Sequence, residues 1–137
     1  MNAKTFLEQI EKLDTMIENK RAEVQRWKDI ANNTAVNMSG ERVQSSGNHD
    51  MVANAICTYL DIEREEIDTL LAKRKDIIGV IEQLPPDEYD LLHKVYVQYF
   101  TLKEITYMKK RSYSWATTTH EKALNNLQKI LNKRSEQ

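Results

Sequence analysis

The stretch from Leu84 to Lys133 decides the fold, and it reads LPPDEYDLLHKVYVQYFTLKEITYMKKRSYSWATTTHEKALNNLQKILNK. Its apolar residues recur three or four places apart, and no part of it alternates convincingly at every second place. This spacing predicts helices. Breaks at Pro85-Pro86, at Thr101 and at Lys109-Lys110-Arg111 divide the stretch into three helices, of which the last is the longest.

The paired prolines indicate a domain boundary. Each proline restricts the residue before it away from helical angles, so a preceding helix is expected to end at Leu84. Pro86 then suits the first turn of the next helix, where the negative charges of Asp87 and Glu88 are favourable. We therefore expect one domain over residues 1–84 and a second over residues 85–137.

The two later breaks carry capping signals. Thr101 can cap a short helix, and Glu104 stands three residues further on, as a capping box requires. Ser112 or Ser114 can cap the final helix. A short helix, a tight turn and a longer helix form a helix-turn-helix, in which the second helix enters the major groove of DNA.

The outward face of the final helix and the basic turn before it are the expected DNA contacts. Hydroxyl groups can bond to phosphates or base edges, and the basic turn and the N-terminus of the short helix can hold phosphate. The residues expected to face inward are Ala116, Thr119, Ala123 and Leu127. The residues expected to contact DNA are Thr101, Lys103, Lys109, Lys110, Arg111, Ser112, Tyr113, Ser114, Trp115, Thr117, Thr118, Glu121 and Lys122.

Two aromatic residues of the final helix each allow two interpretations. Trp115, beside the basic turn, either stacks or packs against a sugar of the DNA, or it seals the final helix against the helix that follows the prolines; the usual burial of large aromatic side chains favours the second interpretation. His120 either faces a phosphate or bonds to the helix that follows the prolines.

Before the prolines, two long amphipathic helices are expected, over residues 3–32 and 50–84. Turn-forming residues between them, from Asn32 to Asp50, interrupt both apolar seams. The helices are expected to fold back as an antiparallel, coiled-coil-like hairpin in which facing residue numbers sum to about 83, with Lys20 opposite Glu63. The alternative is a parallel coiled coil between two chains, which would make a homodimer. The apolar seam positions are Phe6, Ile10, Leu13, Ile17, Val24, Trp27 and Ala31, then Ile56, Leu60, Ile67, Leu70, Ile77, Ile81 and Leu84.

Charge is distributed unevenly along the 137 residues, although the formal net charge is only -1. Residues 101–137 hold eight Lys or Arg against three acids, whereas residues 1–100 hold twelve against eighteen. A basic end on an acidic body fits a protein that presents one end to a polyanion such as DNA.

Catalytic and metal motifs are missing from the sequence. His49, His93 and His120 are scattered, and no Gly-rich phosphate loop or paired metal-ligand motif occurs. Cys57, the only cysteine, is expected to be a small buried side chain in a reducing compartment. The start of the chain lacks the apolar core of a signal peptide, and no apolar run approaches the roughly 20 residues that span a bilayer. We expect no enzyme activity, cofactor, metal or membrane partner, and a cytoplasmic location.

A longer pattern joins these features: TLKEI at 101–105, Ser112, Ala116 and HEKALNNL at 120–127, preceded by Leu84-Pro85 and the approach from Tyr96 to Thr101. It resembles region 4 of sigma factors, a helix-turn-helix that ends in an Ala-Leu-x-x-Leu helix. With the long N-terminal helices and the VQSS segment at 43–46, the chain is similar to small phage-encoded proteins of Gram-positive hosts, the ArpU/RinA-like regulators of phage late genes.

This resemblance implies regulation of transcription by binding double-stranded promoter DNA in a bacterial host cell. By position it assigns Tyr113, Ser114, Thr117 and Thr118 to the groove-facing sites. Thr106 and Lys110 stand where the family usually has Ala and Gly or Asn, and Met108 falls one place early, so a remodelled turn is expected. A DNA-packaging subunit and an adaptor that binds RNA polymerase are the alternative functions.

Overall fold

In the part of the chain that the structure describes, every regular element is a helix. The computed structural model describes residues 1–40 and 46–136. None of these residues lies in a strand, so the all-helical prediction is confirmed, and none of their helices is long and apolar enough to cross a bilayer. In chain order the elements are α1 (Ala3–Gly40), α2 (Ser46–Asp61), the π-helix η1 (Ile62–Ile67), α3 (Asp68–Ile81), α4 (Pro86–Leu92), the π-helix η2 (His93–Val97), α5 (Leu102–Lys109) and α6 (Tyr113–Ser135).

The packing of these helices forms two compact units. The terminal unit consists of Met1–Leu13 and Lys73–Gln137, and the long-helix unit consists of Asp14–Ala72. These boundaries differ from the division expected at the prolines, because the first turns of α1 and the end of α3 belong with the C-terminal helices. α3 also stops at Ile81, before Leu84, and Pro86 begins α4 as expected.

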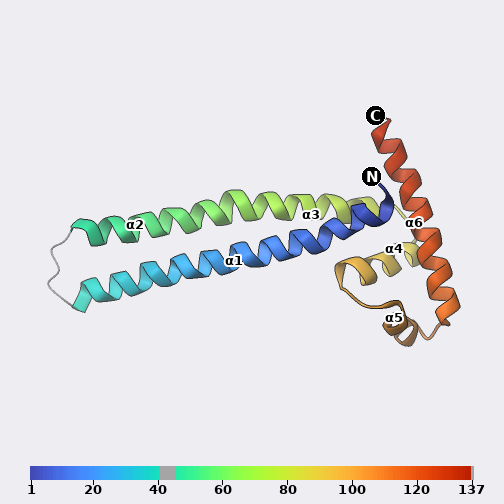
Figure 1. The fold of residues 1–137 in the computed structure, drawn as a ribbon, viewed down its shortest axis with the longest axis horizontal. Coiled ribbons are helices and arrows are strands. Elements are labelled where there is room, and N and C mark those ends of the chain that lie inside the picture. Colours follow the sequence, from blue (N-terminus) through green and yellow to red (C-terminus); the bar gives the residue numbers. More distant parts are fainter. Residues whose placement is uncertain (41–45, 137) are drawn as a thin grey trace. The chain divides into compact units, whose positions relative to one another are not determined.

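Within the long-helix unit, α1 and the segment formed by α2, η1 and the start of α3 run antiparallel (Figure 1). Lys20 pairs with Glu66 and Lys28 pairs with Glu63, each at 3.1 Å between nitrogen and oxygen. The expected pairing of Lys20 with Glu63 is therefore wrong, since the numbers of the paired residues sum to 86 and 91 and not to about 83. Exposed pairs of this kind contribute about 0–1 kcal/mol each, so the buried apolar seam supplies most of the stability.

The π-helix η1 changes which residues of the second long segment face the buried side. Ile62 and Ile67 are both buried, although they are five positions apart in the sequence. In a regular α-helix, residues five apart point about 140° away from each other, whereas the wider π turn returns them to one face. Ala55 and Ile62 consequently take the buried places that were expected for Ile56 and Leu60, which are only half-buried.

Two further expectations about the N-terminal helices are corrected. α1 continues through Asn32 to Gly40, because asparagine and threonine weaken a helix by only a fraction of a kcal/mol and no proline intervenes. Cys57 is exposed, not buried, since Ala55 occupies the inner face two residues earlier. Residues 43–45 of the VQSS segment and the side chain of His49 lie outside the described residues.

In the terminal unit, α6 packs against both α4 and α5 (Figure 1). A hydrogen bond of 2.6 Å, from Asn126 Nδ2 to the buried Glu88 Oε1, joins α6 to α4. The helix that follows the prolines is not a regular α-helix throughout, because α4 continues into the π-helix η2, which ends at Val97. Two residues later, Tyr99 has a φ of 63°, in the left-handed region. The most deeply buried residues of these C-terminal helices are Leu91, Leu92, Ile105, Ala116, Ala123 and Leu127.

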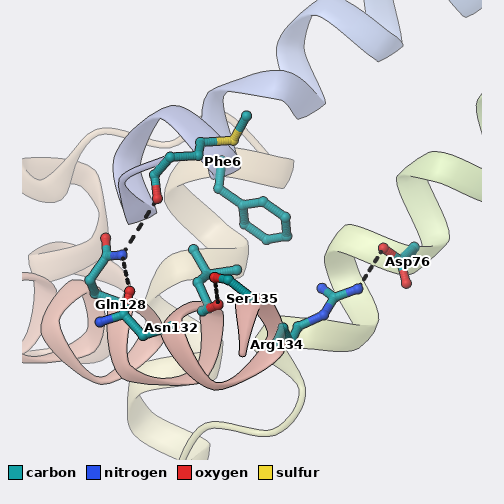
Figure 2. Close-up of a pocket in the computed structure, with 8 residues that line it drawn as sticks. Phe6, Asp76, Gln128, Asn132, Arg134 and Ser135 are labelled. Atoms are coloured by element: carbon teal, nitrogen blue, oxygen red, sulfur yellow. Dashed lines mark hydrogen bonds and ion pairs between the residues drawn. The ribbon is translucent and has the colours of Figure 1, made fainter. Parts of the chain in front are cut away.

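The end of α6 contacts the start of the chain and the end of α3. Gln128 Oε1 accepts the Ala3 backbone N–H at 2.7 Å, and Arg134 lies 3.4 Å from the Asp76 carboxylate. Figure 2 shows these polar side chains around an open cavity of about 470 Å³, which Phe6 and Leu131 also line. The cavity belongs to the packing of the terminal unit, and the expected DNA-contacting residues do not line it.

Candidate nucleic-acid interface

A complete capping box begins α5. The Thr101 hydroxyl accepts the backbone N–H of Glu104 at 3.2 Å, and the Glu104 carboxylate accepts the backbone N–H of Thr101 at 3.3 Å. The predicted cap is confirmed. Because the box engages both the N–H and the hydroxyl of Thr101, that residue is not a free phosphate donor, whereas the Lys103 side chain is exposed.

A left-handed residue ends α5 and turns the chain toward α6. Lys110 has a φ of 56° and a ψ of 44°, and the Arg111 backbone N–H bonds to the Thr106 carbonyl at 3.1 Å. Side chains on this backbone cost about 1–2 kcal/mol, which explains why glycine or asparagine is the usual choice at such a cap. Ser112 then caps α6, as one of the two predicted alternatives, by accepting the Trp115 backbone N–H at 3.0 Å.

The first turns of α6 are exposed on one face. Tyr113 is 59% exposed, and Ser114, Thr118, Glu121 and Lys122 are also exposed. The opposite face is buried at Ala116, Ala123 and Leu127, as expected, while Thr119 is half-buried.

Thr117 differs from the other expected groove-facing residues. It is half-buried, and its hydroxyl donates to the Ser114 carbonyl at 3.1 Å. This hydroxyl is therefore already used within its own helix.

Asn125 was not among the expected contact residues, but it shares their face. Thr118, Glu121, Lys122 and Asn125 are spaced as one stripe of a helix, all four are exposed, and none of their side chains bonds to another described residue. The same three-and-four spacing that predicted the helix could have identified Asn125. The expected contacts ended at Lys122, one turn before Asn125.

The three cations of the basic turn are not equivalent. Lys109 forms an ion pair with Asp90 of α4, whereas Lys110 and Arg111 form no ion pair with any residue that the structure describes. The Arg111 guanidinium lies 5.3 Å from the centre of the Trp115 ring, which is a cation–π distance. Trp115 is half-buried, so part of its ring is packed within the protein while its face also contacts Arg111.

His120 bonds to the helix that follows the prolines, which was one of its two interpretations. Its Nε2 lies 3.0 Å from the Tyr96 hydroxyl of η2, and the two rings stack. Burial, then the charge of Lys4, lowers the pKa of His120 below its ordinary value. Burial, then the charge of Glu8, raises the pKa of Tyr96. Both shifts favour the state in which the phenol and the imidazole are neutral.

We expect acid to destabilise the terminal unit through His120. The unfolded chain binds a proton at His120 near its ordinary pKa of 6.5, and the folded chain does so only at lower pH. The contribution of His120 to the free energy of unfolding should therefore be constant well above pH 6.5. It should fall as the pH drops through 6.5 toward the lower pKa of the folded chain. His93, whose pKa is also lowered, by burial first and then by Lys94 and Arg74, acts in the same direction.

Replacing His120 by glutamine tests this expectation, because the amide can donate or accept a hydrogen bond with Tyr96 and does not titrate. Urea unfolding of both proteins at pH 7.5 and pH 5.5 should show a smaller loss for His120→Gln. Equal losses would assign the acid sensitivity to His93 or to the carboxylates.

No group of three or more His, Cys, Asp or Glu side chains among residues 1–40 and 46–136 is arranged to hold a metal ion. Comparisons with protein-family models, with curated proteins and with solved structures found no match to this chain.

Proposed function

We propose that this chain is a sequence-specific regulator of phage or prophage transcription that binds double-stranded DNA with α5, the basic turn and α6. The observation that carries the proposal is that an exposed face of α6 directly follows, in the sequence, a turn in which Lys110 and Arg111 have no carboxylate partner. The phage setting rests on the resemblance to the ArpU/RinA-like regulators. On this proposal, a C-terminal helix-turn-helix of the sigma region 4 type binds the operator, and the long helices serve dimerisation or contact with polymerase.

The chemistry of the basic turn suits a phosphate backbone. Lys110 and Arg111 are exposed, and stacking on Trp115 restricts the Arg111 guanidinium, so less side-chain freedom is lost when it binds. Lys103 on α5 and Lys122 on α6 add exposed positive charge. Contacts of this kind position a protein on DNA without reading its sequence.

The exposed stripe of α6 offers groups that distinguish bases. An asparagine amide pairs with the N6 and N7 atoms of adenine, and a glutamate accepts a hydrogen bond from the cytosine N4 amino group. Asn125 and Glu121 carry these groups, and Thr118 adds a methyl that can contact thymine. An acidic side chain weakens phosphate binding, so an unpaired Glu121 on this face suits base recognition better than general affinity.

A selection from random duplexes tests the proposal. The natural protein should enrich a defined site that contains adenine, and Asn125→Ala should lose the adenine preference at one position. The expected loss of discrimination there is about 1–3 kcal/mol. Asn19→Ala is the matched control, since Asn19 is an exposed asparagine of α1 in the other unit and should leave the selected site unchanged. Failure of the natural protein to enrich any duplex would reject the proposed function.

An adaptor that binds RNA polymerase is the second candidate, and exposed apolar groups on α5 favour it. Tyr107 is 76% exposed and Met108 is 46% exposed, and phosphate binding needs neither. Co-purification with polymerase that Tyr107→Ser abolishes, together with no enrichment of duplexes, would favour the adaptor. A closed ring in light scattering would instead favour a DNA-packaging subunit.

A further inference from the structure

Asp90 forms ion pairs with two lysines, Lys94 one turn further along the chain and Lys109 in α5. Its Oδ1 atom lies 2.6 Å from the Lys94 ammonium, and its Oδ2 atom forms the ion pair with Lys109, the last residue of α5. The Asp90 side chain is 29% exposed and that of Lys109 is 36% exposed, so the pair is partly shielded from solvent. One carboxylate of α4 thus holds the first cation of the basic turn.

The surroundings keep Asp90 ionised. Burial alone would raise its pKa, but the hydrogen bonds and charges of Lys109 and Lys94 hold the pKa below its ordinary value. The carboxylate is therefore charged at any pH near neutrality. It also offsets the mutual repulsion of Lys109, Lys110 and Arg111, which are consecutive in the sequence.

We propose that Asp90 is an internal counter-ion that holds Lys109 in the free protein and competes with DNA phosphate for it. This inference rests on the proposed function, because it concerns how strongly the same turn binds a duplex. A carboxylate and a phosphate oxygen are alternative acceptors for one lysine ammonium. Lys110 and Arg111 bind phosphate without breaking any ion pair, whereas Lys109 contributes to phosphate binding only after its pair with Asp90 breaks. Asp90 therefore lowers the affinity for DNA of any sequence and increases the share of binding that depends on base contacts.

Replacing Asp90 by asparagine tests the competition. Fluorescence anisotropy with a random-sequence duplex should show binding tighter by about three- to tenfold at low salt. The slope of log affinity against log salt should steepen by about 0.9, the value for one additional phosphate contact. Asp87→Asn is the matched control: it removes an exposed carboxylate from the first turn of α4 that forms no ion pair with the cations of the turn, and it should change the affinity much less.

A second substitution identifies the released cation. The gain in Asp90→Asn should disappear when Lys109→Gln is added and should persist when Lys94→Gln is added. In the natural background, Lys109→Gln should have little effect on the affinity. Circular dichroism of each variant separates these effects from unfolding.

Three results would overturn the inference. Asp90→Asn binding no more tightly than Asp87→Asn would show that Asp90 does not compete. A loss of affinity in folded Asp90→Asn would show that Asp90 positions Lys109 for phosphate instead. Absence of duplex binding by the natural protein as well would reject the proposed function along with the inference, whereas the first two results would leave that function intact.

Discussion

Replacing Lys110 and Arg111 together by glutamine is expected to weaken duplex binding by about a hundredfold or more, because each charge-assisted contact contributes about 1.5–3 kcal/mol. These are the two cations of the turn that no carboxylate of the described chain neutralises. The loss should be similar for every duplex, because phosphate contacts carry no sequence information. The slope of log affinity against log salt should fall by about 1.8 for two lost phosphate contacts.

The control for this prediction must change the charge equally. Lys73 and Lys75 are exposed on α3, in the same unit, and their replacement by glutamine also removes two positive charges. That variant should retain most of the affinity and the salt dependence. If both double variants lost affinity to the same extent, the effect would come from net charge, and the turn would have no special role.

Local interactions explain which parts of the fold could be predicted. The capping box of Thr101 and Glu104, the Ser112 cap and the proline at the start of α4 depend on residues within one turn of each other. The left-handed turn at Lys110 occurs where the resembling family has glycine or asparagine, so the backbone conformation typical of those residues is present without them.

Features that depend on tertiary packing could not be predicted. The π turn that keeps Ile62 and Ile67 on one face changes which residues before it are buried, and the seam pattern alone did not reveal it. The pair between Lys109 and Asp90 joins residues 19 positions apart, so Lys109 was predicted as a phosphate contact without its counter-ion. The sequence shows which residues are cations, but only the packing shows which of them already form an ion pair with a carboxylate.

Replacing Ile105 by alanine is expected to lower the free energy of unfolding of the terminal unit by about 2–5 kcal/mol, the usual cost when isoleucine in a core is truncated. Ile105 is fully buried in α5, the helix that packs against α6. Domains are stable by only about 5–15 kcal/mol, so this loss is a large fraction of the total. The basic turn depends on the position of α5, and duplex binding should therefore weaken together with stability.

The two tryptophans allow this loss of stability to be measured in the terminal unit alone. Trp27 belongs to the long-helix unit and Trp115 to the terminal unit, so in a Trp27→Phe background the fluorescence reports only the terminal unit. Urea unfolding of Ile105→Ala in that background should show the lower midpoint, and Met108→Ala should change the free energy of unfolding by at most about 0.5 kcal/mol, since Met108 is 46% exposed on the same helix. Equal losses in the two variants would mean that the packing of α5 on α6 does not depend on Ile105, and the position of the basic turn would then need another explanation.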